Sequence, residues 1–148
     1  NAHVPSETAL DSLTALLRTF ASPILSEVRR GLGADSQIIY RPLEQFLMPP
    51  PWSRGRIALI GDAAHATTPH LAAGACIGLE DAFVLVDEIT SGTSLGKALR
   101  SFEGRRFERC RMVVETSGRL CEIEISGGDK ALHVQLMRDA MAVLAQPI

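Results

Sequence analysis

Apolar residues recur three or four positions apart near the start of the chain, at Leu10, Leu13, Leu17 and Phe20. This spacing places them on one face of a predicted helix, and Thr8 with Asp11 resembles a capping box at its start. Ser22 followed by Pro23 predicts the start of a second helix, because serine caps helix N-termini and proline fits the first helical turn. We expect this second helix to turn Ile24 inward.

The middle of the chain has the pattern of extended structure. Residues 37–48 contain β-branched and aromatic residues, and three prolines at 49–51 then stop any regular element. The apolar run at 57–60 is bounded by Gly55 and Gly61. A short run that is apolar throughout is typical of a strand buried on both faces, so we predict one strand of a parallel sheet.

The second half of the chain has helical spacing almost throughout. Residues 75–91 are apolar on most faces, which predicts a buried helix. A long helix is predicted over 95–125, where Gly104 and Gly118 are possible bends. A last helix follows over 131–144, after a pair of glycines.

One buried parallel strand needs neighbours, which must come from a partner chain or from residues before the first one here. The sequence begins without Met, and Asn1-Ala2-His3 lacks the features of a signal peptide. With 148 residues, of which 46% are hydrophobic and 22% charged, the composition is that of a globular domain. We therefore expect this chain to be a segment of a longer protein.

Charge and cysteine content exclude several classes of protein. Fifteen basic and seventeen acidic residues give a net charge of −2, which supplies no broad electrostatic footprint for nucleic acid. No apolar run approaches the roughly 20 residues of a membrane span. The three cysteines, Cys76, Cys110 and Cys121, are an odd number without C-x-x-C spacing. A reducing, cytoplasmic setting is therefore expected.

Candidate chemistry lies between the predicted strand and the helix that follows it. The strand ends at Gly61, the carboxylate of Asp62 follows at once, and a loop of small residues with Pro69 leads to Gly74, where the helix begins. Ligands of α/β sheets bind at the carboxyl ends of strands, and a helix N-terminus offers free N–H groups. A ligand with hydroxyls near the carboxylate and an electron-rich edge near the helix start would fit.

This segment resembles a known flavin-binding motif. Residues 56–82 carry G-D-A-A-H at 61–65, then Pro69, a glycine at Gly74 and E-D-A at 80–82. In this they resemble the third FAD-binding motif of the group A flavoprotein monooxygenases, the family of para-hydroxybenzoate and salicylate hydroxylases. The resemblance implies an α/β parent with the FAD/NAD(P)-binding fold. This chain would be a mostly helical part of it, with one or two strands of the parent sheet.

The resemblance also implies roles for single residues. The carboxylate after the strand would bind the ribityl or pyrophosphate part of FAD, the proline would lie beside the isoalloxazine, and the helix start would meet its pyrimidine edge. The implied cofactor-binding residues are Gly61, Asp62, Pro69, Gly74, Ala75 and Cys76. Many members have Gly-Gln-Gly where this chain has 72–74, and the G-x-G-x-x-G turn that holds the ADP half of FAD does not occur.

By this resemblance the chain is the C-terminal part of an FAD- and NAD(P)H-dependent monooxygenase that hydroxylates a small aromatic substrate. Residues 1–48 would end the substrate or middle region, 55–92 would form the third FAD motif, and 93–148 the C-terminal helices. The isolated chain is expected to be inactive and to self-associate through an exposed strand edge or its helices. The alternatives are a related flavin-dependent reductase, epoxidase or halogenase, or a non-catalytic helical association module.

Simpler interpretations exist for several residues. Asp62, His65 and His70 lack the spacing that puts two imidazoles on one helical face, so we expect no metal site and a packed His65. Cys76 is expected to be a small core residue, and Trp52 a packed surface anchor rather than a residue that stacks on a substrate. A basic cluster interleaved with glutamates predicts a solvated, salt-bridged helix face; it comprises Lys97, Arg100, Arg105, Arg106, Arg109 and Arg111.

Overall fold

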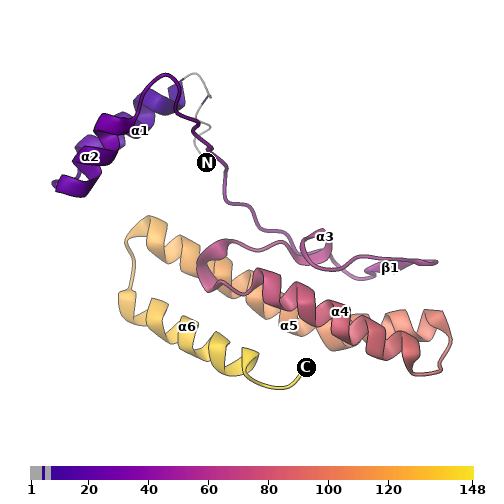
Figure 1. The fold of residues 1–148 in the computed structure, drawn as a ribbon. Helices are drawn as coiled ribbons and strands as arrows, with labels where there is room; N and C mark the ends of the chain where they lie inside the picture. The colour runs from indigo at the N-terminus through magenta and orange to yellow at the C-terminus, as the bar shows by residue number, and fades with distance from the viewer. Residues whose placement is uncertain (1–4, 6–7) are drawn as a thin grey trace. The chain divides into compact units, whose positions relative to one another are not determined.

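The computed structural model describes residue 5 and residues 8–148. The chain divides into two compact units, one up to Leu43 and one from Glu44 to Ile148. The described residues are mostly helical, with two short strands (Figure 1). This confirms the predicted character of the chain.

The first unit is a pair of helices, α1 (Ala9–Arg18) and α2 (Pro23–Gly31), which pack against each other. The predicted cap of α2 is present, because the Ser22 hydroxyl accepts a hydrogen bond from the Leu25 N–H at 3.5 Å. Ser22 also has the extended backbone of an N-cap residue. The start of α2 is therefore fixed by local sequence.

Two predictions for this unit are wrong. Thr8 does not form a capping box, because its hydroxyl donates to the Pro5 carbonyl at 3.2 Å and makes no cap hydrogen bond to α1. Ile24 is not turned inward, since 72% of its surface is exposed. Two short helices enclose too little volume to bury an apolar face on each.

The second unit is built around one long helix. It contains α3 (Asp62–His65), the 3₁₀ turn η2 (Pro69–Leu71), α4 (Gly74–Thr90), α5 (Leu95–Ser126) and α6 (Lys130–Leu144). Helices α4 and α6 each pack along α5, and η2 and α3 also contact it (Figure 1). Helix α5 is therefore the support on which the other elements are placed.

Helix α5 runs without a break through Gly104 and Gly118, so the bends considered at these glycines do not interrupt it. It ends at Gly127, whose φ of +64° is a left-handed conformation that glycine adopts without strain. Helix α6 then starts at Asp129, whose carboxylate accepts hydrogen bonds from the backbone N–H groups of residues 131 and 132.

The helix predicted to be buried on most faces is buried on one. Ile77, Asp81 and Val84 of α4 lie against α5 and are buried. Phe83, on another face, is 72% exposed. Helix α4 therefore has two apolar faces. Within the described residues, one of them packs against α5 and the other is exposed.

The predicted buried parallel strand is wrong in its partner and its burial. Strands β1 (Ser53–Arg54) and β2 (Ile57–Ala58) form an antiparallel hairpin, with Ser53 opposite Ala58. Gly55 turns the chain with a φ of +62°, so the nearest segment becomes the strand partner. Ile57 is 71% exposed.

The predicted extended segment lies beside the short helix α3. The N–H groups of Phe46 and Met48 donate to the carbonyls of Ala66 and Ala64, both at 2.8 Å. No regular strand is assigned to residues 37–48, which are described in full. Residues 46–48 therefore run alongside residues 64–66, and the predicted strand character of 37–48 is not realised as a regular strand.

Trp52 is the largest fully buried side chain of the described residues, at 1% exposure, so its predicted packing is confirmed and its predicted place at the surface is wrong. Its ring N–H donates to the Met48 carbonyl at 2.8 Å. Its ring packs against those of His65, Phe102 and Phe107, with centroids 5.6 to 6.3 Å apart. Trp52 therefore joins the hairpin to α3 and α5.

Within the described residues, none of the helices has both the length and the apolar character required to cross a membrane.

Candidate functional site

The turn after β2 begins with an unusual backbone conformation. Gly61 has φ +56° and ψ −141°, and it precedes the single helical turn α3. Its carbonyl accepts hydrogen bonds from the N–H groups of Ala64 and His65, both at 2.9 Å. Helix α4 approaches closely at Gly78, because a Cβ added there would lie 3.6 Å from the Gly61 Cα. Two glycines thus let the turn and the helix meet backbone to backbone.

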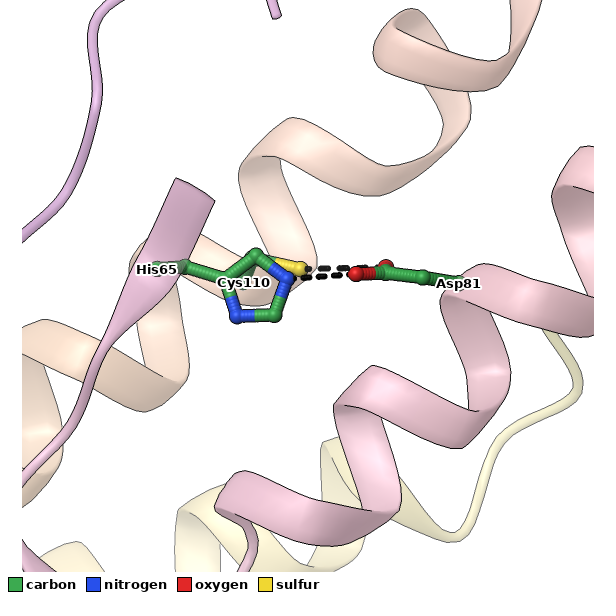
Figure 2. A group of neighbouring side chains, drawn as sticks. All are labelled: His65, Asp81 and Cys110. Atoms are coloured by element: carbon green, nitrogen blue, oxygen red, sulfur yellow. Dashed lines mark hydrogen bonds and ion pairs between the residues drawn. The ribbon is translucent and has the colours of Figure 1, made fainter. Parts of the chain in front are cut away.

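A buried carboxylate on α4 receives hydrogen bonds from this turn and from α5 (Figure 2). Asp81, which is fully buried, accepts from the Gly61 N–H at 2.9 Å and from His65 Nε2 at 2.6 Å. Arg106 Nε donates to its other oxygen at 2.8 Å, and the Cys110 thiol lies 3.8 Å from the same oxygen. One carboxylate therefore joins α3, α4 and α5.

The charge of this carboxylate is fixed by its partners. Burial alone would raise the pKa of Asp81, but hydrogen bonds from His65, Gly61 and Arg106 outweigh it and hold the pKa below its ordinary value. Burial would lower the pKa of Arg106, whereas its hydrogen bond to Asp81 raises it, and the net direction is upward. Asp81 and Arg106 therefore form a buried ion pair. The second ring nitrogen of His65, Nδ1, is buried and finds no hydrogen-bond partner among the described residues.

The ion pair extends to a second carboxylate. Glu80 is 2.8 Å from Arg106 Nη1 and takes two hydrogen bonds of 2.8 Å from Arg109. Burial alone would raise the pKa of Glu80, but the hydrogen bonds from Arg109 and Arg106 outweigh this effect and hold the pKa below its ordinary value. Arg109 also donates to the carbonyls of Val143 and Leu144, each at 2.8 Å. The network therefore fastens both α4 and the end of α6 to α5.

This cluster has some of the ligand types of a metal site. One ligand atom each from His65, Asp81 and Cys110 lies within 4.8 Å of the others. The Arg106 guanidinium, however, already supplies the positive charge beside Asp81. Burial raises the pKa of the Cys110 thiol to about 12, so at neutral pH this side chain is a thiol that donates toward Asp81. The cluster is an ion-paired anchor, and of the Asp62, His65 and His70 weighed in the sequence it contains His65 alone.

A pocket of about 440 Å³ lies next to the turn and the start of α4. Four of the six predicted cofactor-binding residues line it: Asp62, Pro69, Gly74 and Ala75. Thr67, Thr68 and Ala72 complete the lining. The structure thus brings together a carboxylate, a proline and a helix start that are adjacent in the motif.

The other two predicted residues stand differently. Gly61 is outside the pocket lining, and its N–H donates to Asp81. Cys76 is outside the pocket lining and is exposed, so its prediction as a small core residue is wrong. The buried residue of this turn is the next one, Ile77, because the helix rotates by about 100° per residue.

Small residues form the wall of the pocket. A Cβ added at Gly74 would lie 2.9 Å from the Thr67 Cγ2, closer than real contacts allow. Ala72 has a left-handed backbone with φ +54°, a conformation that favours the glycine found there in many members of the resembled family. The first turn of α4 has Ala73 at its N-cap and no side-chain cap. Its N–H groups are therefore left for another acceptor.

The predicted salt-bridged face of α5 is present in part, at Arg105 and Arg111. Arg105 pairs with Asp87 at 2.5 Å and with Glu88 at 2.8 Å, and Arg111 pairs with Glu108. Arg106 is instead buried at 1% exposure. The sequence did not mark Arg106 or Asp81 as site residues. The signal in the sequence that could have identified them is a charged residue on the apolar face of each helix, Asp81 on α4 and Arg106 on α5.

A family model described as "FAD binding domain" matches residues 42–117. YetM of Bacillus subtilis is 31% identical over 140 residues, which cover 95% of this chain and 37% of YetM. The FAD-dependent urate hydroxylase of Klebsiella oxytoca is 40% identical over 79 residues, which cover 53% of this chain and 20% of that protein. The chain thus spans little more than a third of these relatives at most.

The solved structures include a match of similar extent. HpxO of Klebsiella pneumoniae, crystallised with FAD and uric acid, is 28% identical with a TM-score of 0.65, covering 93% of this chain and 36% of that one. This likeness confirms that the mostly helical chain is a portion of the FAD-binding fold. Because the family model covers half of the residues, the chain belongs to the FAD binding domain family, as the resemblance of residues 56–82 predicts.

Proposed function

We propose that this chain forms the flavin-proximal part of an FAD- and NAD(P)H-dependent monooxygenase that hydroxylates a small ring compound. The observation that carries the proposal is the pocket where Asp62, Pro69 and the uncapped start of α4 converge. The proposed domain roles are those expected from the motif, with 1–48 ending the middle region, 55–92 forming the third FAD motif and 93–148 the C-terminal helices.

The residues of the pocket suit FAD. The exposed Asp62 carboxylate accepts hydrogen bonds from hydroxyl groups such as those of a ribityl chain. The N–H groups of Gly74 and Ala75, at the positive end of α4, favour an electron-rich ring edge. Bound FAD would supply the activation of dioxygen. The chain's own residues bind and orient it, with Pro69 on the side facing the substrate.

The substrate class follows from the relatives. One is named a urate hydroxylase, and the HpxO structure is a complex with FAD and uric acid. A flat aromatic or nitrogen-containing ring is therefore the proposed substrate, with NAD(P)H as the electron donor and the cytoplasm as the compartment. Neither nucleic acid nor a membrane is a proposed partner. Self-association through the exposed apolar face of α4 is proposed for the isolated chain.

The test is Asp62→Ala in a full-length protein that carries this segment. FAD affinity, measured by flavin fluorescence, is expected to fall about ten- to hundredfold, since hydrogen bonds to a charged group contribute roughly 1.5–3 kcal/mol. Glu115→Gln, on the exposed surface of α5, removes the same charge and is the control. An unchanged dissociation constant for Asp62→Ala would remove this carboxylate from the site.

Two further measurements separate the alternatives. Substrate-dependent NAD(P)H oxidation with oxygen inserted into the product distinguishes a monooxygenase from a reductase, epoxidase or halogenase. The 148-residue chain by itself is expected to elute colourless from gel filtration after mixing with FAD, because one half of a two-part site loses most of the affinity. Elution with one flavin per chain would show that no further region is needed.

A further inference from the structure

We propose that Asp81 is a positioning residue for Asp62, and that it acts by holding both ends of the turn that carries this carboxylate. The inference rests on the proposed function, because it assigns the positioning of the same FAD site. Asp62 lies between Gly61 and His65, and these two residues hydrogen-bond the same oxygen of Asp81, at 2.9 and 2.6 Å. Asp81 itself is fully buried and outside the pocket lining.

The turn needs such a hold. Helix α3 is four residues long and has no side-chain cap at its start. A single helical turn is unstable in isolation, because few hydrogen bonds offset the ordering of its backbone. Asp62 is exposed, and the backbone of the turn sets the position of its Cβ, from which the carboxylate extends. Whatever fixes Gly61 and His65 therefore fixes Asp62.

The holding carboxylate is itself rigid. Arg106 binds Asp81 at 2.8 Å and also donates to the Ile77 carbonyl, one turn earlier on α4, at 3.1 Å. On the other side, the Trp52 ring lies 5.6 Å from the His65 ring. The hydrogen bonds from Arg106 to Asp81 and from His65 to Asp81, the second of which is drawn in Figure 2, therefore fix the turn relative to α5.

The chemistry of Asp81 suits this role and no neutral residue replaces it. All its hydrogen-bonding neighbours donate: a backbone N–H, an imidazole N–H, a guanidinium and a thiol. Asparagine has the same shape, but its amide group is a donor and would face another donor. Asp81→Asn is therefore the variant of choice, since it keeps the volume, removes the charge and replaces one of the two acceptor oxygens by a donor.

The test is a double-mutant cycle on FAD affinity in a full-length protein that carries this segment. Asp81→Asn is expected to weaken FAD binding about tenfold, in the range seen when a supporting hydrogen-bond partner is removed at metal sites. In the background of Asp62→Ala, the same substitution should change the FAD dissociation constant less than twofold. Equal effects in both backgrounds, or no effect of Asp81→Asn on FAD, would overturn the proposal.

A matched control separates positioning from general stability. Glu80 is the neighbour of Asp81, binds the same Arg106 and makes no hydrogen bond to the turn. Glu80→Gln is expected to lower the melting temperature and leave FAD affinity unchanged. If Glu80→Gln weakens FAD binding as much as Asp81→Asn does, the effect is stability alone and the proposal fails.

A second readout needs no flavin. Because Asp81 accepts from Nε2, the His65 ring should carry its proton on Nε2 and leave Nδ1 bare, a tautomer that ¹⁵N ring shifts identify in the 148-residue chain. Asp81→Asn should change those shifts, and Glu80→Gln should not. Unchanged shifts in Asp81→Asn would contradict the proposed hold. If Asp62→Ala leaves the FAD dissociation constant unchanged while the His65 shifts behave as expected, the proposed flavin site is refuted and the hold by Asp81 is not.

Discussion

The Ser117 hydroxyl of α5 donates to the Thr68 carbonyl at 2.5 Å and accepts from the Leu71 N–H at 3.3 Å. The Thr68 hydroxyl lies 2.9 Å away and completes the bonding of the same oxygen. Both residues are buried. One side chain thereby holds the loop that contains Pro69 against the central helix, and uses its full hydrogen-bonding capacity to do so.

Ser117→Ala should therefore destabilise the chain. The substitution leaves a buried carbonyl and a buried N–H without their partner, which costs about 1–3 kcal/mol. Urea unfolding followed by circular dichroism measures the loss. Ser126→Ala, at the exposed end of α5, removes a hydroxyl that donates to Ile123 and should change stability by less than about 0.5 kcal/mol. Equal losses in the two variants would show that the Thr68 loop is held by other contacts.

Gly74→Val should close the pocket. A Cβ at this position already meets the Thr67 methyl at 2.9 Å, and the extra methyl groups of valine add to the overlap. Overpacking of this kind costs about 1–3 kcal/mol, and a full-length protein with this variant should purify without flavin. Gly104→Val, on an exposed part of α5 with open space around it, is the matched control and should retain flavin. A Gly74→Val protein with its full flavin content would place the ring elsewhere.

The three cysteines should react in a fixed order with a maleimide at neutral pH. Cys76 is exposed, Cys121 is partly buried, and Cys110 is fully buried with its pKa raised to about 12 by burial. Cys76 should be labelled first and Cys110 only after unfolding, because the thiolate is the reactive form. Mass spectrometry of digested protein reads the order. Labelling of Cys110 in the folded chain would contradict the burial of the Asp81 cluster.

Acid should destabilise the chain through the ion-paired carboxylates of Asp81 and Glu80. The pKa values of Asp81 and Glu80 lie below their ordinary values of 3.8 and 4.5, so the folded state releases these protons more readily than the unfolded state does. Their stabilisation is complete above the ordinary values and is lost as pH falls through the lowered ones. Urea midpoints measured from about pH 6 down to pH 3 should fall, and fall less steeply in Asp81→Asn. An identical slope in that variant would assign the acid sensitivity to other groups.

The helices could be predicted because their signals are local. The cap at Ser22, the break at Gly127 and the spacing along α5 depend on residues a few positions apart. The strand was mispredicted because burial on both faces requires neighbours, and the sequence of residues 57–60 does not identify them. The turn at Gly55 instead paired this segment with the residues just before it.

The site was predictable to the extent that it is one continuous motif. Asp62, Pro69, Gly74 and Ala75 follow each other closely, so a pattern of spacing places them at one pocket. Asp81 and Arg106 are 25 residues apart on different helices, and their pairing depends on how α4 and α5 pack. A spacing rule within one helix cannot predict a contact between two helices, so the sequence did not identify Asp81 and Arg106 as a pair.

Gly61 and Gly78 face each other, yet the two positions should tolerate substitution to different degrees. A methyl group at position 78 would sit 3.6 Å from the opposing Cα, an ordinary contact, so alanine is tolerated there. Position 61 combines the same neighbour with a φ of +56°, so every side chain is strained. In a saturation library, functional variants should therefore carry substitutions at position 78 and not at position 61, and those at 78 should be small residues such as alanine.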